Sequence, residues 1–317
     1  MRARGWPGLC LGLAALLAVL GPPAGGAPAK APYVIVLGIA QDGGFPQAGC
    51  QRECCRRAWN DRSRRRSVAS LALVDPESSE RWLFDATPDF REQIHLLDAA
   101  APVHGAPALA GIALTHGHIG HYTGLMQLGR EVQDARGVPV YAMPRMAEFL
   151  RGSGPWSQLV RLGNIVLRPL EDGKEISLNA RLRITPFRVP HRDEYTETVG
   201  FRIRGPRRTV TFVPDIDRWE KSSVPLKEIL AGSDAAYLDG TFFAGDELPG
   251  RDMTQVPHPP IVETLAILAA LPPAERSKVR FIHLNHTNPA LDPGSGAARR
   301  IEKAGCRVAE EGERLEL

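Results

Sequence analysis

Three histidines, His116, His118 and His121, fall within six consecutive positions of a chain that holds nine histidines in 317 residues. An extended segment points His116 and His118 to the same side, and a turn at Gly120 can bring His121 to a neighbouring point. Imidazole is a favoured ligand of zinc and of other divalent transition metals. A lone histidine is more often a core or surface residue, but three at this spacing predict a metal site.

More side chains that can bind metals follow apolar, strand-like runs. In α/β architectures such strand ends carry the functional loops. A single aspartate at a strand end can equally be a turn or a helix cap, and this alternative holds for Asp217 and Asp239. The residues singled out in this way are Asp85, His191, Asp215 and His283.

The elements that must position these residues alternate along the chain. Runs typical of strands occupy 33–37, 67–74, 81–84, 111–114, 138–142, 182–189, 199–204, 209–213, 235–238 and 279–282. Helical spacing is found at 88–99, 123–135, 144–151, 262–271 and 295–304. Hairpins in each half with helices between them predict an α/β fold, in which two mixed sheets pack face to face under outer helices.

The first residues have the pattern of an export signal. Arg2 and Arg4 precede an apolar run at 9–20, and small residues follow as far as Ala29. The run is shorter than the ~20 residues that a membrane anchor needs. We therefore expect a signal peptide at 1–29 with cleavage near Ala29, a periplasmic or secreted protein without stable membrane insertion, and one domain at 30–317.

The charge balance argues against nucleic acid as a partner. Removing 1–29 takes away two arginines and no acidic residue, so a formal charge of +3 becomes 3 − 2 = +1. Nucleic-acid binding relies on clustered positive charge. One local cluster of arginines, at 52, 56, 57, 62, 64, 65 and 66, is either a solvated face or a patch that attracts an anionic small-molecule substrate.

Three cysteines, Cys50, Cys54 and Cys55, lie between the first strand and a basic helix. Export permits disulfide bonds, for instance to Cys306. The alternative is a structural zinc site completed by a histidine.

The histidine segment resembles the signature of the metallo-β-lactamase superfamily, His-x-His-x-Asp-His after a strand. The resemblance implies that His116, His118 and His191 bind a first metal, and that His121 and His283 bind a second. Asp215 then bridges both metals, and Asp85 supports the histidine loop by hydrogen bonds. Gly120 stands in the position of the family's aspartate. Either the second metal binds weakly or another group compensates, and on the first reading Gly120→Asp should raise second-metal occupancy.

Motifs over nearly all of the chain after the leader are similar to the coenzyme PQQ synthesis protein B family and its phosphodiesterase relatives. They include Asp42-Gly43-Gly44-Phe45-Pro46-Gln47, Leu238-Asp239-Gly240-Thr241-Phe242 and Asn285-His286-Thr287-Asn288-Pro289. The relatives imply a structural zinc on three cysteines of the first loop and a histidine three residues after the last catalytic one. Here these are Cys50, Cys54, Cys55 and His286, and we favour zinc over disulfides.

The resemblance implies a metal-dependent hydrolase. One or two zinc ions, with iron or manganese as alternatives, would lower the pKa of bound water towards ~7, and the resulting hydroxide would attack a phosphodiester, ester or lactone. His258 resembles the residue that protonates the leaving group, although it can also simply begin a helix. The alternatives are an oxidative enzyme of coenzyme PQQ synthesis and a non-catalytic carrier of a small molecule. The sequence does not specify the substrate, the metal or the oligomeric state.

Overall fold

The computed structural model describes residues 1–3, 5, 30–103 and 108–317. Apart from residues 1–3 and 5, the expected signal peptide lies outside the described residues, and export stays a prediction. Among the described residues, no helix combines the length and apolar composition that crossing a bilayer requires.

Two mixed sheets of seven strands each form the centre of the molecule, which confirms the predicted sandwich. The first has the order β14-β1-β2-β3-β4-β5-β6, and the second has the order β13-β12-β11-β10-β9-β8-β7. The strands of the first sheet are β1 (Tyr33–Gly38), β2 (Ser70–Asp75), β3 (Glu80–Phe84), β4 (Gly111–Ala113), β5 (Val138–Ala142), β6 (Ile165–Pro169) and β14 (Arg314–Glu316). Those of the second are β7 (Ile176–Ser177), β8 (Arg183–Arg188), β9 (Val199–Arg204), β10 (Thr209–Val213), β11 (Ala235–Asp239), β12 (Val279–Ile282) and β13 (Arg307–Val308).

The side-chain alternation of β1 shows how one strand serves two core layers. Val34 and Val36 face the second sheet, whereas Ile35 and Leu37 face the helices on the other side. Between the sheets, Phe84 packs edge-on against Phe201 with ring centroids 5.4 Å apart.

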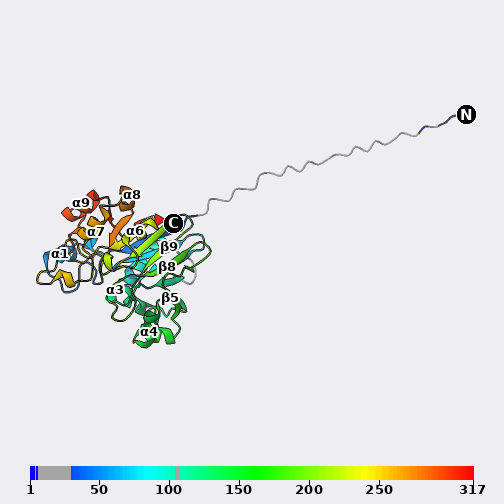
Figure 1. Ribbon diagram of the computed structural model, residues 1–317. Coiled ribbons are helices and arrows are strands. Elements are labelled where there is room, and N and C mark those ends of the chain that lie inside the picture. The colour runs from blue at the N-terminus through cyan, green and yellow to red at the C-terminus, as the bar shows by residue number, and fades with distance from the viewer. Residues whose placement is uncertain (4, 6–29, 104–107) are drawn as a thin grey trace.

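Helices cover the outer faces of both sheets, and in Figure 1 α6 to α9 gather on one side of the molecule while α4 lies at another end. The helices are α1 (Glu53–Asn60), α2 (Phe90–Ala100), α3 (Ile119–Tyr122), α4 (Pro144–Gly152), α5 (Trp156–Arg161), α6 (Leu226–Ala231), α7 (Ile261–Leu268), α8 (Pro273–Arg276) and α9 (Gly296–Lys303). Short 3-10 helices are η1 (Arg62–Arg64), η2 (Thr123–Leu128), η3 (Trp219–Lys221), η4 (Met253–Gln255) and η5 (Pro289–Leu291).

The expected helix at 123–135 is wrong in type and length. The segment forms η2 and then turns, with the backbone N–H groups of 132, 133 and 134 all donating to the Gly129 carbonyl. Gly124 packs against the strand end before α2, where an added Cβ would lie 2.2 Å from the Thr87 carbonyl oxygen. This close approach and the extended backbone at Gly129 stop a regular helix, although the apolar spacing suggests one.

The strand directions gather the loops of interest at one edge of both sheets. β3 and β4 are parallel, as are β10, β11 and β12. β1 runs in the direction of β3, and β8 in the direction of β10, because each pair is separated by one antiparallel neighbour. The segments that follow these strands therefore meet, and they carry the residues that the sequence singled out.

Candidate metal centre

The structure brings together the six predicted ligands of the catalytic metals, and we call them the histidine centre: His116, His118, His121, His191, Asp215 and His283. Their ligand atoms form overlapping groups whose members lie within 4.8 Å of one another. Asp215 is central to these groups. Its Oδ2 lies 2.9 Å from His121 Nε2 and 3.3 Å from His283 Nε2, and its Oδ1 lies 3.8 Å from His191 Nε2.

Asp85 and Thr115 orient two of these imidazoles. Asp85 is fully buried, and its Oδ2 accepts a hydrogen bond from His121 Nδ1 at 2.7 Å. Its Oδ1 accepts from the Thr115 backbone N–H at 2.7 Å. The Thr115 hydroxyl donates to the same carboxylate and accepts from His116 Nδ1 at 2.9 Å. In the neutral imidazoles this leaves the Nε2 atoms of His116 and His121 unprotonated and turned towards the centre.

Asp239 and Thr241 form an equivalent arrangement at the end of the second sheet. Asp239 Oδ2 accepts from His258 Nδ1 at 2.7 Å, and Asp239 Oδ1 accepts from the Thr241 hydroxyl at 2.7 Å. Thr241 in turn accepts from His283 Nδ1 at 2.9 Å. His283, like Asp85, has a positive φ, of 66° and 68° respectively, which is a strained conformation typical of functional positions.

His118 is oriented by a residue that the sequence analysis did not identify. Its Nε2 donates to Glu194 Oε2 at 3.0 Å, so Nδ1 is free to act as a ligand. That Nδ1 lies 2.9 Å from His116 Nε2. Two lone pairs at this distance repel each other unless a cation lies between them.

The residues present fit divalent metal ions. Among buried side-chain atoms without a hydrogen-bond partner are His121 Nε2, both ring nitrogens of His191, and Asp215 Oδ2. Buried polar atoms are rarely left unpaired, and a cluster of unpaired acceptors facing one another is the expected lining of a cation site. Burial acts to raise the pKa of Asp215, but the facing imidazoles hold that pKa well below its usual range.

Asp42 completes the group on the side of His121 and His283. Its Oδ1 lies 3.2 Å from His121 Nε2 and 3.4 Å from His283 Nε2. A Cβ added to Gly120 would lie 2.1 Å from the same Oδ1 and 2.7 Å from the Asp42 Cα. An aspartate at position 120 would therefore collide with Asp42, which argues against the expectation that Gly120→Asp raises second-metal occupancy.

Comparison with known proteins assigns the chain to a family. A model of the β-lactamase superfamily domain matches residues 80–284. Coenzyme PQQ synthesis protein B of Methylobacterium nodulans is 32% identical over 315 residues, which cover 89% of this chain and 99% of that protein. The chain belongs to the metallo-β-lactamase superfamily.

Solved structures with the metallo-β-lactamase fold agree with this assignment. Zinc-bound PqqB from Methylobacterium extorquens superposes with a TM-score of 0.77 at 26% identity, covering 90% of this chain and 100% of that one. A diphosphatase of the PhnP family gives 0.65 at 22% identity, covering 91% and 98%. The fold and the zinc-bound neighbour indicate divalent metal binding.

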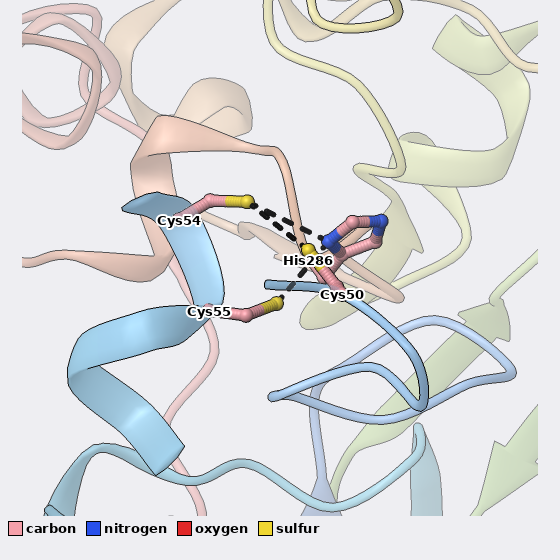
Figure 2. A group of neighbouring side chains, drawn as sticks. All are labelled: Cys50, Cys54, Cys55 and His286. Carbon is pink, nitrogen blue, oxygen red and sulfur yellow. Dashed lines mark hydrogen bonds between the residues drawn. The ribbon is translucent and has the colours of Figure 1, made fainter. Parts of the chain in front are cut away.

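A second group of possible metal ligands lies beside the histidine centre. We call it the cysteine cluster: Cys50, Cys54, Cys55 and His286. Figure 2 shows the four side chains pointing toward one another, with Cys54 and Cys55 on α1 and Cys50 on the segment before it. Cys50 and Cys54 sulfurs are 3.8 Å apart, and Cys55 Sγ lies 3.3 Å from His286 Nδ1. Cys54 and Cys55 thus lie in the first turn of the helix, not in the loop before it.

These separations suit a tetrahedral metal. Zn–S bonds of about 2.3 Å place two sulfurs about 3.8 Å apart, and a sulfur and a nitrogen about 3.6 Å apart. A disulfide needs sulfurs about 2.05 Å apart. The cysteines at 50, 54, 55 and 306 are all free thiols, and Cys306 is buried in the main core, outside this cluster.

Proposed function

We propose that the protein is a metal-dependent hydrolase that cleaves a phosphodiester, with an ester or lactone as the alternative substrate. The histidine centre carries the proposal, because four of its buried atoms face the centre without a hydrogen-bond partner: His121 Nε2, both ring nitrogens of His191 and Asp215 Oδ2. When bound, metal ions supply Lewis acidity, which polarises a phosphoryl or carbonyl oxygen and makes water more acidic.

Asp215 is placed to keep two ligand groups at a fixed separation. Its Oδ2 faces His121, and its Oδ1 faces His191. The carboxylate is 3% exposed, so water competes little for its oxygens. We therefore propose that Asp215 would be a ligand of both metals, with His121 beside one of its oxygens and His191 beside the other.

His258 is placed to deliver a proton to the leaving group. Its Nδ1 is held by Asp239, which leaves Nε2 as the atom that can carry the transferred proton. Burial acts to lower the pKa of His258, but the Asp239 carboxylate more than offsets this, and the pKa is raised. A protonated imidazole near neutral pH is a suitable general acid.

Arginines favour an anionic substrate. A depression next to the histidine centre is lined by His258, Gln41, Arg192 and Arg251. Arg192 also borders a second depression, where the aromatic rings of Phe149, Trp156 and Tyr195 gather beside His118. Guanidinium groups bind phosphate oxygens well, so this part of the surface suits a phosphodiester with an aromatic or apolar substituent.

Substrate turnover by purified protein tests the proposal. Zinc- or manganese-loaded protein should hydrolyse bis(4-nitrophenyl) phosphate, lose the activity on chelation and regain it with metal. His118→Ala should abolish turnover and lower metal content, whereas His95→Ala, on the exposed face of α2, should leave both unchanged. Loaded protein that hydrolyses no phosphodiester, ester or lactone would show that the hydrolase proposal is wrong.

A second candidate, an oxidative role in coenzyme PQQ synthesis, is favoured by the 32% identity with PQQ synthesis protein B over 99% of its length. Histidines with one or two carboxylates also suit iron. Iron in the purified protein, together with oxygen uptake and no hydrolysis, would support this role.

A further inference from the structure

We infer that Asp42 supplies the carboxylate ligand of the second metal position, replacing a carboxylate at position 120. The inference concerns the metal centre on which the proposed function also rests. It accounts for the departure of this chain from the His-x-His-x-Asp-His signature, and it assigns a ligand that precedes the histidine segment by more than seventy residues.

Four atoms form the second position: His121 Nε2, His283 Nε2, Asp215 Oδ2 and Asp42 Oδ1. The four separations between an imidazole nitrogen and a carboxylate oxygen are 2.9, 3.2, 3.3 and 3.4 Å, which are four of the six edges. Metal–ligand bonds of about 2.1 Å in a tetrahedron place neighbouring ligand atoms about 3.4 Å apart. Each imidazole nitrogen is thus already at the separation from both carboxylates that one small divalent cation requires.

Neither carboxylate can accept a hydrogen bond from the neutral form of these imidazoles. His121 donates through Nδ1 to Asp85, and His283 donates through Nδ1 to Thr241, so each neutral ring presents a lone pair at Nε2. Lone pairs of nitrogen and carboxylate oxygen at about 3 Å repel each other, and a divalent cation reverses the sign of every one of these contacts.

Neighbouring residues hold Asp42 in position. The segment after β1 pairs with the segment after β12 through an Ala40 to Leu284 bridge, and the Gln41 N–H donates to the Leu284 carbonyl at 2.8 Å. Gln41 Nε2 donates to Asp42 Oδ2 at 3.2 Å, and Asn285 Nδ2 donates to Gln41 Oε1 at 2.8 Å. A ligating carboxylate is normally held through its other oxygen in this way.

A side chain at position 120 and the Asp42 carboxylate cannot occupy the same space. The added Cβ at 120, 2.1 Å from Asp42 Oδ1, would also come within 2.7 Å of the Asp42 backbone, so the clash is not relieved by a side-chain rotation. A carboxylate at 42 therefore requires glycine at 120.

The test is zinc stoichiometry and affinity, measured on the full chain loaded with zinc alone. We expect three equivalents in the unmodified protein, one in the cysteine cluster and two in the histidine centre. Asp42→Asn keeps the shape of the side chain but removes its charge. It should lower the affinity for one of the three zinc ions by roughly 10- to 100-fold. Asp246→Asn, an exposed carboxylate on the loop before His258, is the charge-matched control and should retain all three.

Gly120→Ala tests the same contact, because the added methyl group would displace Asp42. It should lower the affinity for the same zinc ion. Gly152→Ala, where nothing lies within 4 Å of the added Cβ, is its control. Cobalt absorption spectra separate the thiolate site from the histidine centre, and circular dichroism checks folding. Full zinc affinity in Asp42→Asn, or only one zinc in the unmodified histidine centre, would overturn the inference. Loss of one zinc in Asp42→Asn, with no hydrolysis by the unmodified protein, would support it and contradict the proposed function instead.

Discussion

At the scale of single residues, two pairs of an aspartate and a threonine have the same role, one at the end of each sheet. Asp85 with Thr115 and Asp239 with Thr241 each orient two imidazoles through their Nδ1 atoms. They touch no substrate and act through the histidines, so they are positioning residues. Changing them should alter metal affinity and ring orientation before it alters anything else.

Asp85→Asn should lower zinc affinity of the histidine centre by roughly 10- to 100-fold and reduce thermal stability. The amide that replaces the carboxylate has one NH₂ group, which must face either the Thr115 N–H or the His121 Nδ1–H donor and leaves that donor unpaired. Zinc titration against a competing chelator, with a thermal melt, measures both effects. Asp246→Asn is again the control, and unchanged zinc affinity in Asp85→Asn would contradict the role given to Asp85.

His258→Gln should lower the rate most for substrates with poor leaving groups. If His258 protonates the leaving oxygen, its loss costs roughly 100-fold or more for an alkyl phosphodiester and much less for a nitrophenyl one. The measurement is kcat for a series of leaving groups at constant metal content. An equal loss for all leaving groups would indicate that His258 only shapes the site.

At the scale of elements, α1 is short and has little capping or burial of its own. It has eight residues, carries no side-chain cap at its start, and buries only Cys55 and Ala58. Isolated helices of this length are marginal in water. Bonds from Cys54 and Cys55 to a shared metal would fix the helix against the segment that holds His286.

Chelation should therefore lower the melting temperature, whereas mild reduction should not. Burial raises the pKa of Cys55 to about 12, so ionisation of this thiol depends on a bound cation. Mass spectrometry of denatured, metal-stripped protein should find the cluster thiols free. His286→Ala should lose one zinc and stability, with less effect on chemistry at the neighbouring His283. A native disulfide involving Cys50, Cys54 or Cys55 would exclude the structural zinc.

At the scale of the whole molecule, the C-terminal segment joins the two sheets. It leaves β13 in the second sheet, turns at 309–313 and enters the first sheet as β14. Within the turn, Glu311 Oε1 accepts a hydrogen bond from the Ser67 backbone N–H at 2.6 Å. Burial raises the pKa of Glu311 to about 7, so its charged form is unfavourable in the folded protein.

Glu311 should make folding stability depend on pH. Between its unfolded pKa near 4.5 and about 7, the folded state binds more protons, so stability falls as pH rises and stays lower above pH 7. Glu311→Gln removes this titration. The variant should gain on the order of 1 to 2 kcal/mol over the unmodified protein at pH 8, and little at pH 4. Urea unfolding at both pH values measures the difference, and an equal difference at pH 4 and pH 8 would contradict it.

The sequence by itself determined the kind of fold and most of the metal-binding side chains. Alternation of apolar residues is set by strand geometry, so the strands at 199–204 and 209–213 match β9 and β10. The histidines at 116, 118 and 121 are neighbours along the chain, and their clustering is a local property. The helix at 123–135 failed because its apolar spacing says nothing of the backbone contact at Gly124.

Only the tertiary structure decided which other groups reach the centre. Asp42 and Glu194 are single polar residues in loops, and Asp239 is the last residue of β11, so no local pattern separates a ligand or a support from a turn residue. Asp42 meets His121 and His283 because β1 runs in the direction of β3 and its end pairs with the segment after β12. Sheet order and loop direction depend on contacts between residues far apart in the chain, and the spacing of residues along the chain does not encode them.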